Sequence, residues 1–326
     1  NDAETRLSFT RMLNESTLPS PHATPHLAAL ETLFGGFVPH DGVVQTQRMH
    51  RLLQTDRELQ LWRVSVGGPA WISWTLTLIW PRHAKRCPVL LSPDACWPHV
   101  LGNDAVSATL QQETALAWFN RTELAFDNDT AQREGPVFEH WPHLSSGCLA
   151  VWAWGLQCCV DALRQINDGR MSGIAVAGHS RGGKAALLAT ALDDRIDAVI
   201  AHNSGTAGAA SLAITPPSAE SLSQLASQFP HWLGPDTQQA AVREHLMAID
   251  APRFLLEHIA PRGVCLLQAS DDLWANPEGT RHMAEVLGPH WQGHPRRLQW
   301  HERTGGHAMT AADWQKAAHF VREVLG

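Results

Sequence analysis

Residues 174–192 read IAVAGHSRGGKAALLATAL, and this stretch decides the fold. Its first residues form a short apolar run typical of a buried strand, and the stretch from Lys184 onward is rich in helix-forming residues. Ser180 lies at the junction, with Gly178 and Gly182 two residues away on either side. A serine in such a tight turn adopts a strained backbone that raises its hydroxyl above the sheet. We therefore predict that Ser180 is a nucleophile, the alternative being a glycine-rich turn without a chemical role.

A serine nucleophile needs a base, and the 19 histidines of the chain offer several candidates. His307 follows the strand expected over residues 297–300 and precedes a helix that Thr310 can cap. His301 competes with it, but a histidine at the end of a strand is more often packed or half-exposed. His179 lies beside the serine and points the wrong way to deprotonate it, which favours a supporting role. We predict that His307 is the base.

Two carboxylates follow the strand expected over residues 264–269. Asp272 lies three residues beyond this strand, at the usual reach of an acid loop, and we prefer it to Asp271. Its carboxylate would accept the imidazole N–H and fix the tautomer that can take the serine proton. One of the two aspartates can instead cap the following turn, and both roles can be filled together.

The rest of the chain alternates short strand-like runs with helical stretches, which is typical of a mostly parallel sheet covered on both faces. The order of serine, acid and histidine along such a chain predicts the α/β-hydrolase fold, a three-layer sandwich with a mostly parallel central sheet. Strands are expected at residues 88–91, 115–122, 174–177, 198–201, 264–269 and 297–300, and helices at about 146–166, 182–192, 277–287 and 311–324.

The opening third of the chain has a different pattern. Residues 59–66 and 71–80 alternate apolar and polar side chains on either side of Gly67-Gly68-Pro69, which predicts an antiparallel hairpin at the N-terminal edge of the sheet. We expect residues 1–58 to form a helical or loop segment packed on the sheet, and residues 204–237 an excursion near the active site. Because no linker divides the chain, we expect a single domain over its 326 residues.

Charge and composition limit the partners. The formal net charge of -7 argues against binding to nucleic acid, which needs clustered basic residues. No apolar run reaches the roughly 18 residues that a membrane span needs, so no membrane partner is expected. The chain opens with Asn1-Asp2-Ala3-Glu4 and not with Met, which we interpret as the sign of a removed leader. We therefore expect a secreted or periplasmic monomer.

The six cysteines are too scattered for a disulfide framework and show no metal-binding CxxC spacing, although one or two disulfides stay open. Acyl transfer by a serine requires neither a metal nor an organic cofactor, and none is expected. The 14 tryptophans suit sugar or aromatic ligands, but most are expected to fill the core. The cysteines are Cys87, Cys96, Cys148, Cys158, Cys159 and Cys265.

Further motifs follow one another along residues 115–326, with a weaker one at residues 30–34. They are Ala153-Trp154-Gly155, Gly178-His179-Ser180-Arg181-Gly182-Gly183-Lys184, Asn203-Ser204-Gly205, Phe229-Pro230-His231-Trp232, Glu257-His258-Ile259-Ala260-Pro261-Arg262, Asp272-Leu273-Trp274-Ala275-Asn276-Pro277 and Gly306-His307. In this order they resemble the glucuronoyl esterases of carbohydrate esterase family 15, especially the bacterial branch.

The resemblance implies a serine esterase that cleaves the ester between 4-O-methylglucuronic acid side chains of xylan and the alcohols of lignin, through an acyl-enzyme on Ser180. It implies that Arg181 helps to form the oxyanion hole. It also implies sugar contacts by Lys184, Trp274, Glu220 and Trp232.

Two positions depart from the family pattern. Fungal members carry their catalytic glutamate where this chain has Asn203, and an amide cannot supply the charge that stabilises an imidazolium. The acid must then come from elsewhere, and the bacterial arrangement, an aspartate after the later strand, agrees with the choice of Asp272. Residues 206–208 read Thr-Ala-Gly where relatives often have Cys-Gly-Gly, which puts a family disulfide there in doubt.

Other functions stay open. The same residues fit an acetyl xylan esterase or another carboxylic ester hydrolase, because fold and triad set the reaction type and not the acyl pocket. The amide at Asn203 also suggests a second alternative, a catalytically silent carbohydrate-binding relative. A decayed enzyme need not keep both Asp272 and His307, so these two residues separate the hypotheses. A scaffold or partner-binding protein has no feature in its favour.

Overall fold

The computed structural model describes residues 25–40, 43–67, 72–128 and 131–326. The expected turn at Gly68-Pro69, the start of its second strand at Trp71, and the opening residues Asn1-Asp2-Ala3-Glu4 lie outside these ranges.

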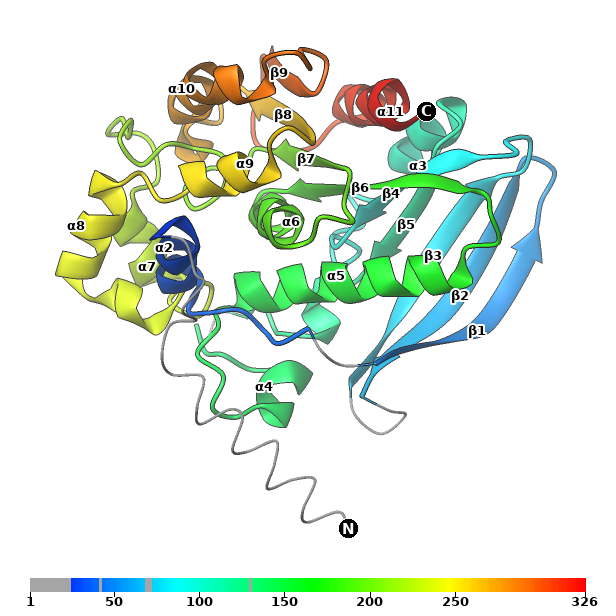
Figure 1. Cartoon of the computed structure of the whole chain (residues 1–326), viewed down its shortest axis with the longest axis horizontal. Coiled ribbons are helices and arrows are strands. Elements are labelled where there is room, and N and C mark those ends of the chain that lie inside the picture. The colour runs from blue at the N-terminus through cyan, green and yellow to red at the C-terminus, as the bar shows by residue number, and fades with distance from the viewer. Residues whose placement is uncertain (1–24, 41–42, 68–71, 129–130) are drawn as a thin grey trace, which may run out of the picture.

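A single sheet with the strand order β1-β2-β3-β5-β4-β6-β7-β8-β9 forms the middle of the molecule (Figure 1). The pairs β1–β2, β2–β3 and β3–β5 are antiparallel, and every other pair is parallel. The predicted fold class, a mostly parallel sheet with an antiparallel N-terminal edge, is therefore confirmed. The strands are β1 (Val44–Leu53), β2 (Arg57–Val66), β3 (Ile72–Pro81), β4 (Cys87–Ser92), β5 (Ala115–Phe119), β6 (Met171–His179), β7 (Ala198–His202), β8 (Gly263–Ala269) and β9 (Leu298–Arg303).

Helices cover both faces of the parallel part. They are α2 (Pro25–Phe34), α3 (Asn103–Gln111), α4 (Pro136–His140), α5 (Cys148–Ile166), α6 (Arg181–Leu192), α7 (Leu222–Gln228), α8 (Ala240–Ala248), α9 (Arg253–Ile259), α10 (Pro277–Leu287) and α11 (Ala311–Leu325). Short 3-10 turns are η1 (Arg121–Glu123), η2 (Pro235–Gln238), η3 (Leu273–Ala275) and η4 (Gly288–Trp291).

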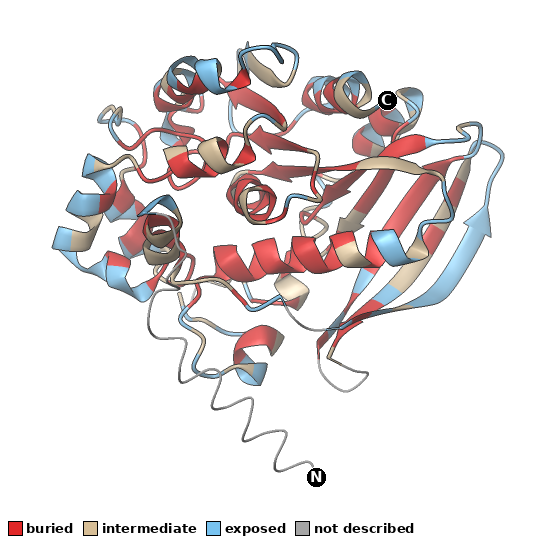
Figure 2. Ribbon diagram, in the orientation of Figure 1, coloured by how far each residue is buried: buried red, intermediate tan, exposed pale blue. Residues whose placement is uncertain are grey.

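Strand β6 shows how the sequence separates the two layers. Ile174 and Val176 belong to the core shared with α5 and α6, whereas Ala175 and Ala177 belong to the core shared with α3 and α11. Successive side chains of a strand point to opposite faces, so a continuous apolar run is buried on both sides. Figure 2 shows this burial across the parallel strands and along α5.

The segment before residue 59 contains a strand as well as a helix, which corrects the expectation of a helical or loop segment. β2 and β3 form the predicted antiparallel pair. They do not end the sheet, because β1 pairs with the other side of β2 along its length. Most of β1 is exposed, as Figure 2 shows. Without a buried face, its sequence VQTQRMHRLL carries no alternation of apolar and polar residues that would predict a strand.

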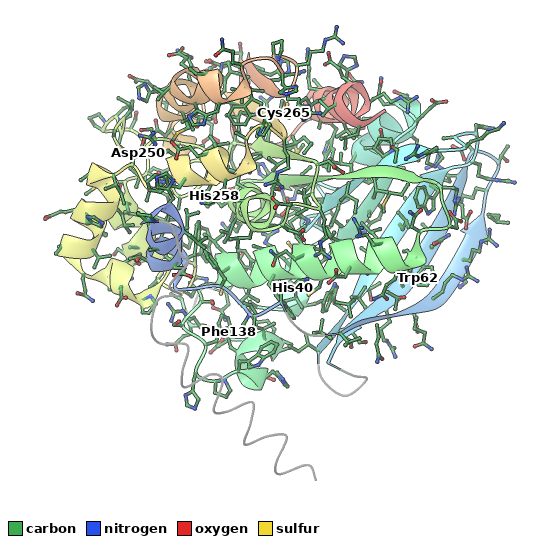
Figure 3. The ribbon with its side chains drawn as sticks, viewed as in Figure 1. His40, Trp62, Phe138, Asp250, His258 and Cys265 are labelled. Atoms are coloured by element: carbon green, nitrogen blue, oxygen red, sulfur yellow. The ribbon has the colours of Figure 1, made fainter. Side chains whose placement is uncertain are left out.

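Side-chain contacts fix the segments that lie outside the sheet (Figure 3). His40 lies against α5, where its Nε2 is 2.8 Å from an Asp161 carboxylate oxygen. The excursion over residues 204–237 contains α7 and a stretch, 204–212, in which every residue is buried, followed by a more exposed loop over residues 213–218. Asp250 holds it by accepting from the Ser211 hydroxyl and from a neighbouring backbone N–H, each at 2.7 Å.

Two absences concern the described residues. All six cysteines lie within them, and none is paired. No helix in the described ranges has the length and apolar character that crossing a bilayer requires.

Candidate active site

Ser180 lies between β6 and α6 with φ 54° and ψ -120°, a conformation that non-glycine residues rarely adopt. Its backbone N–H donates to His202 O over 2.8 Å, which holds the turn against β7. A Cβ at Gly178 would lie 2.1 Å from Gly182 O, so the turn closes only with glycine there. The structure therefore places Ser180 in the strained turn that the sequence predicts.

Asp94, which the sequence analysis missed, supports this turn from below. It lies in the loop after β4, is completely buried, and accepts the backbone N–H of His179 over 2.7 Å. A Cβ at Gly182 would lie 2.1 Å from the Asp94 carboxylate, so a glycine at this position is needed to leave room for Asp94. Its position directly after a buried parallel strand, at the carboxyl edge of the sheet, was the available signal.

His307 and Asp272 meet at the same edge, after β9 and β8. The imidazole Nδ1 lies 2.6 Å from Asp272 Oδ2, and the carboxylate is 8% exposed whereas the imidazole is 48% exposed. Asp271 instead accepts the backbone N–H of Gly305 at 3.0 Å. The structure thus brings Asp272 to the imidazole and gives Asp271 the task of holding the loop. His301 lies on β9 with its Nε2 3.0 Å from Gln299 Oε1.

His179 links the imidazole to the turn. Its ring centre lies 4.6 Å from that of His307, and because His179 precedes Ser180, the imidazole and the serine lie at one end of the sheet. Burial, followed by the nearby His202 and His307, lowers the pKa of His179 to about 2. The ring is therefore neutral at physiological pH, and His307 packs against an uncharged surface.

A second buried histidine fixes the first. His179 Nδ1 and His202 Nδ1 are 2.8 Å apart, and His202 Nε2 lies 3.4 Å from Asp313 Oδ2. Arg303 Nε donates to both Asp313 oxygens at 2.9 Å. The nearby Asp313 charge favours a proton on His202 Nε2, which leaves Nδ1 to accept the Nδ1–H of His179. His202 was not predicted from the sequence, since its partners come from two distant segments.

Asn203 brackets the histidine loop. Its amide nitrogen donates to His307 O at 3.1 Å, and its amide oxygen accepts the Ala269 N–H at 2.8 Å. Asn203 therefore links the backbone of His307 to the end of β8, three residues before Asp272.

Arg181 and Trp232 pack together. The Arg181 guanidinium carbon lies 4.3 Å from the Trp232 ring centre, and Arg181 Nη1 donates to Asp127 at 2.8 and 2.9 Å. Trp232, expected from the resemblance to contact sugar, is 3% exposed and stacks on Phe229 at 3.9 Å between ring centres. Its ring forms the wall behind Arg181.

Lys184, Glu220 and Trp274 form a further group of neighbouring residues. Lys184 is 4% exposed, and its Nζ donates to Ser204 O and Thr206 O at 2.6 and 2.5 Å. Burial lowers the pKa of Lys184 to about 8 although Glu220 opposes that shift, and burial likewise raises the pKa of Glu220 against the pull of Lys184. The Glu220 N–H donates to Trp274 O at 3.0 Å, and Trp274 is 43% exposed.

The arrangement combines a raised hydroxyl, a histidine with a bound carboxylate, an arginine at the N-terminus of a helix, and a buried polar pair beside an exposed tryptophan. These groups suit acyl transfer to a serine from a polar, ring-shaped acyl group. Within the described residues, no group of three histidine, cysteine or acidic side chains is arranged to hold a metal ion.

Residues 70–292 match the family model described as glucuronyl esterase, fungi. A carbohydrate esterase from an unknown prokaryotic organism is 33% identical over 193 residues, which cover 54% of this chain and 44% of the relative. A 4-O-methyl-glucuronoyl methylesterase from Hypocrea jecorina (strain QM6a) is 26% identical over 231 residues, covering 68% of this chain and 48% of the relative. The matched stretch is thus less than half of each relative's length.

The fold is similar to that of solved structures along nearly the whole chain. A glucuronoyl esterase from Solibacter usitatus superimposes with a TM-score of 0.77 at 23% sequence identity, and the match covers 92% of this chain and 91% of that one. At this identity the similarity establishes the fold.

Proposed function

The chain belongs to the glucuronoyl esterase family, and from that premise we propose that it is a serine esterase acting on esters of 4-O-methylglucuronic acid. Family membership confirms the resemblance that the motifs indicated. The observation that carries the proposal is the placement of the strained Ser180 and of the hydrogen-bonded His307 and Asp272 after the carboxyl ends of neighbouring parallel strands.

The proposed reaction has two halves. Ser180 attacks the ester carbonyl while His307 takes its proton, and the alcohol leaves with that proton as the acyl-enzyme forms. Asp272 holds the imidazole tautomer and stabilises the imidazolium. Arg181 provides donors for the oxyanion, since its backbone N–H is at a helix N-terminus, and a well-aimed donor contributes about 3 kcal/mol. Water activated by His307 then releases the uronic acid.

We propose that Lys184, Glu220 and Trp274 recognise the sugar. Lys184 donates two of its N–H groups to backbone carbonyls, so the third can donate to a sugar hydroxyl or to Glu220. Glu220 supplies acceptor oxygens, and the exposed Trp274 offers a flat face on which a sugar ring can stack. The Lys184 ammonium is already buried and fixed by two backbone carbonyls, so it loses little entropy on binding.

The substrate is proposed by analogy with relatives. Curated relatives are named 4-O-methyl-glucuronoyl methylesterases, and one solved relative from Sporotrichum thermophile, a variant, is in complex with methyl 4-O-methyl-beta-D-glucopyranuronate. We propose that this chain acts on the corresponding side chains of xylan where they are esterified to lignin alcohols. A polymer of that kind lies outside the cell, which agrees with the expectation of a secreted or periplasmic enzyme.

The test is a direct comparison of two substrates. We expect hydrolysis of benzyl glucuronate with a kcat/KM at least about tenfold above that for release of acetate from acetylated xylan, because the acyl site is built for a polar ring. The opposite ranking would identify an acetyl xylan esterase. Binding of glucuronate without turnover of either ester would identify a silent carbohydrate-binding relative.

A further inference from the structure

Arg181 contacts its partner carboxylate in an unusual way. Its Nη1 donates to both oxygens of Asp127, at 2.9 and 2.8 Å, and its Nε is buried without a hydrogen-bond partner among the described residues. Arginine–carboxylate pairs commonly use two nitrogens against two oxygens. Here a single nitrogen, Nη1, carries the contact, and because Nε is buried, Nη2 is the nitrogen left for a second anionic group.

Three aromatic rings enclose the same guanidinium. Its carbon lies 4.3 Å from the ring centre of Trp232, 5.3 Å from that of Trp97 and 5.6 Å from that of Phe229. The Trp232 indole N–H donates to Asp127 Oδ1 over 3.2 Å, so one ring both packs on the arginine and fixes its carboxylate. The rings and Asp127 together restrict the orientation of Arg181.

A second arginine ties Asp127 to the turn that carries the nucleophile. Arg121 is completely buried, donates from Nη1 to Asp94, and places Nη2 3.5 Å from Asp127 Oδ2. Asp94 in turn accepts the backbone N–H of His179 at 2.7 Å. Asp94 therefore holds the residue before the proposed nucleophile, and Asp127 holds the side chain of the residue after it.

The two arginines of this cluster differ in exposure. Arg121 is 0% exposed between Asp94 and Asp127, whereas Arg181 is 26% exposed beside the nucleophile. His231 lies 4.0 Å from Asp127 and adds no charge at neutral pH, because burial lowers its pKa. The two carboxylates thus balance the two arginines, and only Arg181 faces the site.

We propose that Asp127 is a positioning residue for ester hydrolysis: it holds the Arg181 guanidinium so that Nη2 faces the oxyanion that forms when Ser180 attacks. The inference rests on the proposed function, because it takes Arg181 as an oxyanion donor. A donor that is already oriented stabilises developing charge without reorganising, whereas a freely swinging arginine must first be ordered.

The first experiment separates kcat from KM. Asp127→Asn keeps the shape but weakens the hold on Arg181, and we expect kcat on benzyl glucuronate to fall about tenfold or more with KM changed less than about twofold. The matched control is Asp168→Asn. Its carboxylate accepts from Arg170 Nε at 2.9 and 3.0 Å, and it lies just before the first residue of β6, at the opposite end of the strand from Ser180. It should leave both constants unchanged.

A double-mutant cycle then distinguishes positioning from a structural role. If Asp127 acts through Arg181, Asp127→Asn should cost about tenfold in kcat in the parent chain and less than about twofold in an Arg181→Ala background. Equal losses in the two backgrounds, or an unchanged kcat in the parent, would overturn the proposal. Circular dichroism and thermal melts verify that each variant is folded.

Two further measurements keep the test decisive. If Asp127→Asn does not fold, Asp127→Glu keeps the charge and shifts it by one methylene, and kcat should still fall only when Arg181 is present. If the parent chain does not cleave benzyl glucuronate, the proposed function fails by itself. The cycle is then run on the labelling rate of Ser180 by a fluorophosphonate, where additive losses would reject Asp127 as a positioning residue.

Discussion

The two groups of side chains near Ser180 are held in different ways. In the first group, His307 is 48% exposed and lies on a loop, where Asp272 and the contact of Asn203 with the His307 carbonyl orient it. In the second group, Lys184 is buried and fixed to two backbone carbonyls. A group that passes protons to a leaving alcohol and to water needs access to solvent, whereas a group that recognises a sugar benefits from being rigid. The first group should therefore govern kcat, and the second KM.

Ser180→Ala removes the centre on which both groups act and has the largest expected effect. We expect kcat on benzyl glucuronate to fall by about 10⁴-fold or more, because no acyl-enzyme can form. Glucuronate should still bind, since Lys184 and Glu220 stay in place. Steady-state kinetics and calorimetric binding measure the two quantities. Retained turnover would reject Ser180 as nucleophile.

Asp272→Asn changes the residue that orients the His307 imidazole. We expect kcat to fall about 10³- to 10⁴-fold with little change in KM, because an amide favours the wrong imidazole tautomer. Asp271→Asn is the matched control, since its carboxylate contacts the Gly305 N–H and the Ser270 hydroxyl. It should cost less than about tenfold, the loss of one loop hydrogen bond. A larger loss for Asp271→Asn would reassign the acid.

A substitution at Lys184 tests the group proposed to bind the sugar and has the smallest expected effect on turnover. Lys184→Met should raise KM about tenfold and change kcat little, because a charged hydrogen bond to the substrate is lost equally in ground and transition states. An unchanged KM would remove Lys184 from the sugar site.

The same lysine predicts a pH dependence in the parent enzyme. Burial lowers the pKa of Lys184 to about 8, so the folded protein carries this charge below pH 8 and loses it as the pH rises through that value. KM should therefore rise between about pH 7 and 9, and Lys184→Met should abolish the rise. A rise that persists in the variant would assign the titration to another group.

The sequence predicted the residues whose position depends on local order along the chain. Ser180, Asp272 and His307 each follow a strand with a clear apolar run, and parallel strands deliver their carboxyl ends to one edge. Asp94 was missed because it reaches His179 across 85 positions of sequence, and His202 because its role depends on packing between β6, β7 and α11.

The strand β1 was missed for a different reason. Strand prediction from sequence relies on alternating burial, and β1 has little burial to leave such a trace. Its existence depends on pairing with β2, a contact that hydropathy does not record.

That strand also affects how the molecule behaves at high concentration. β1 ends the order of described strands, and it exposes Met49, Leu52 and Leu53 by 50%, 45% and 52%. An open edge with apolar side chains is a template for stacking one molecule on another. Arg48 lies among these residues, whereas the Arg51 charge is paired with Glu58 at 2.7 Å. A charged side chain on an edge strand disfavours pairing with a second copy, and this protection weakens as salt screens the charge.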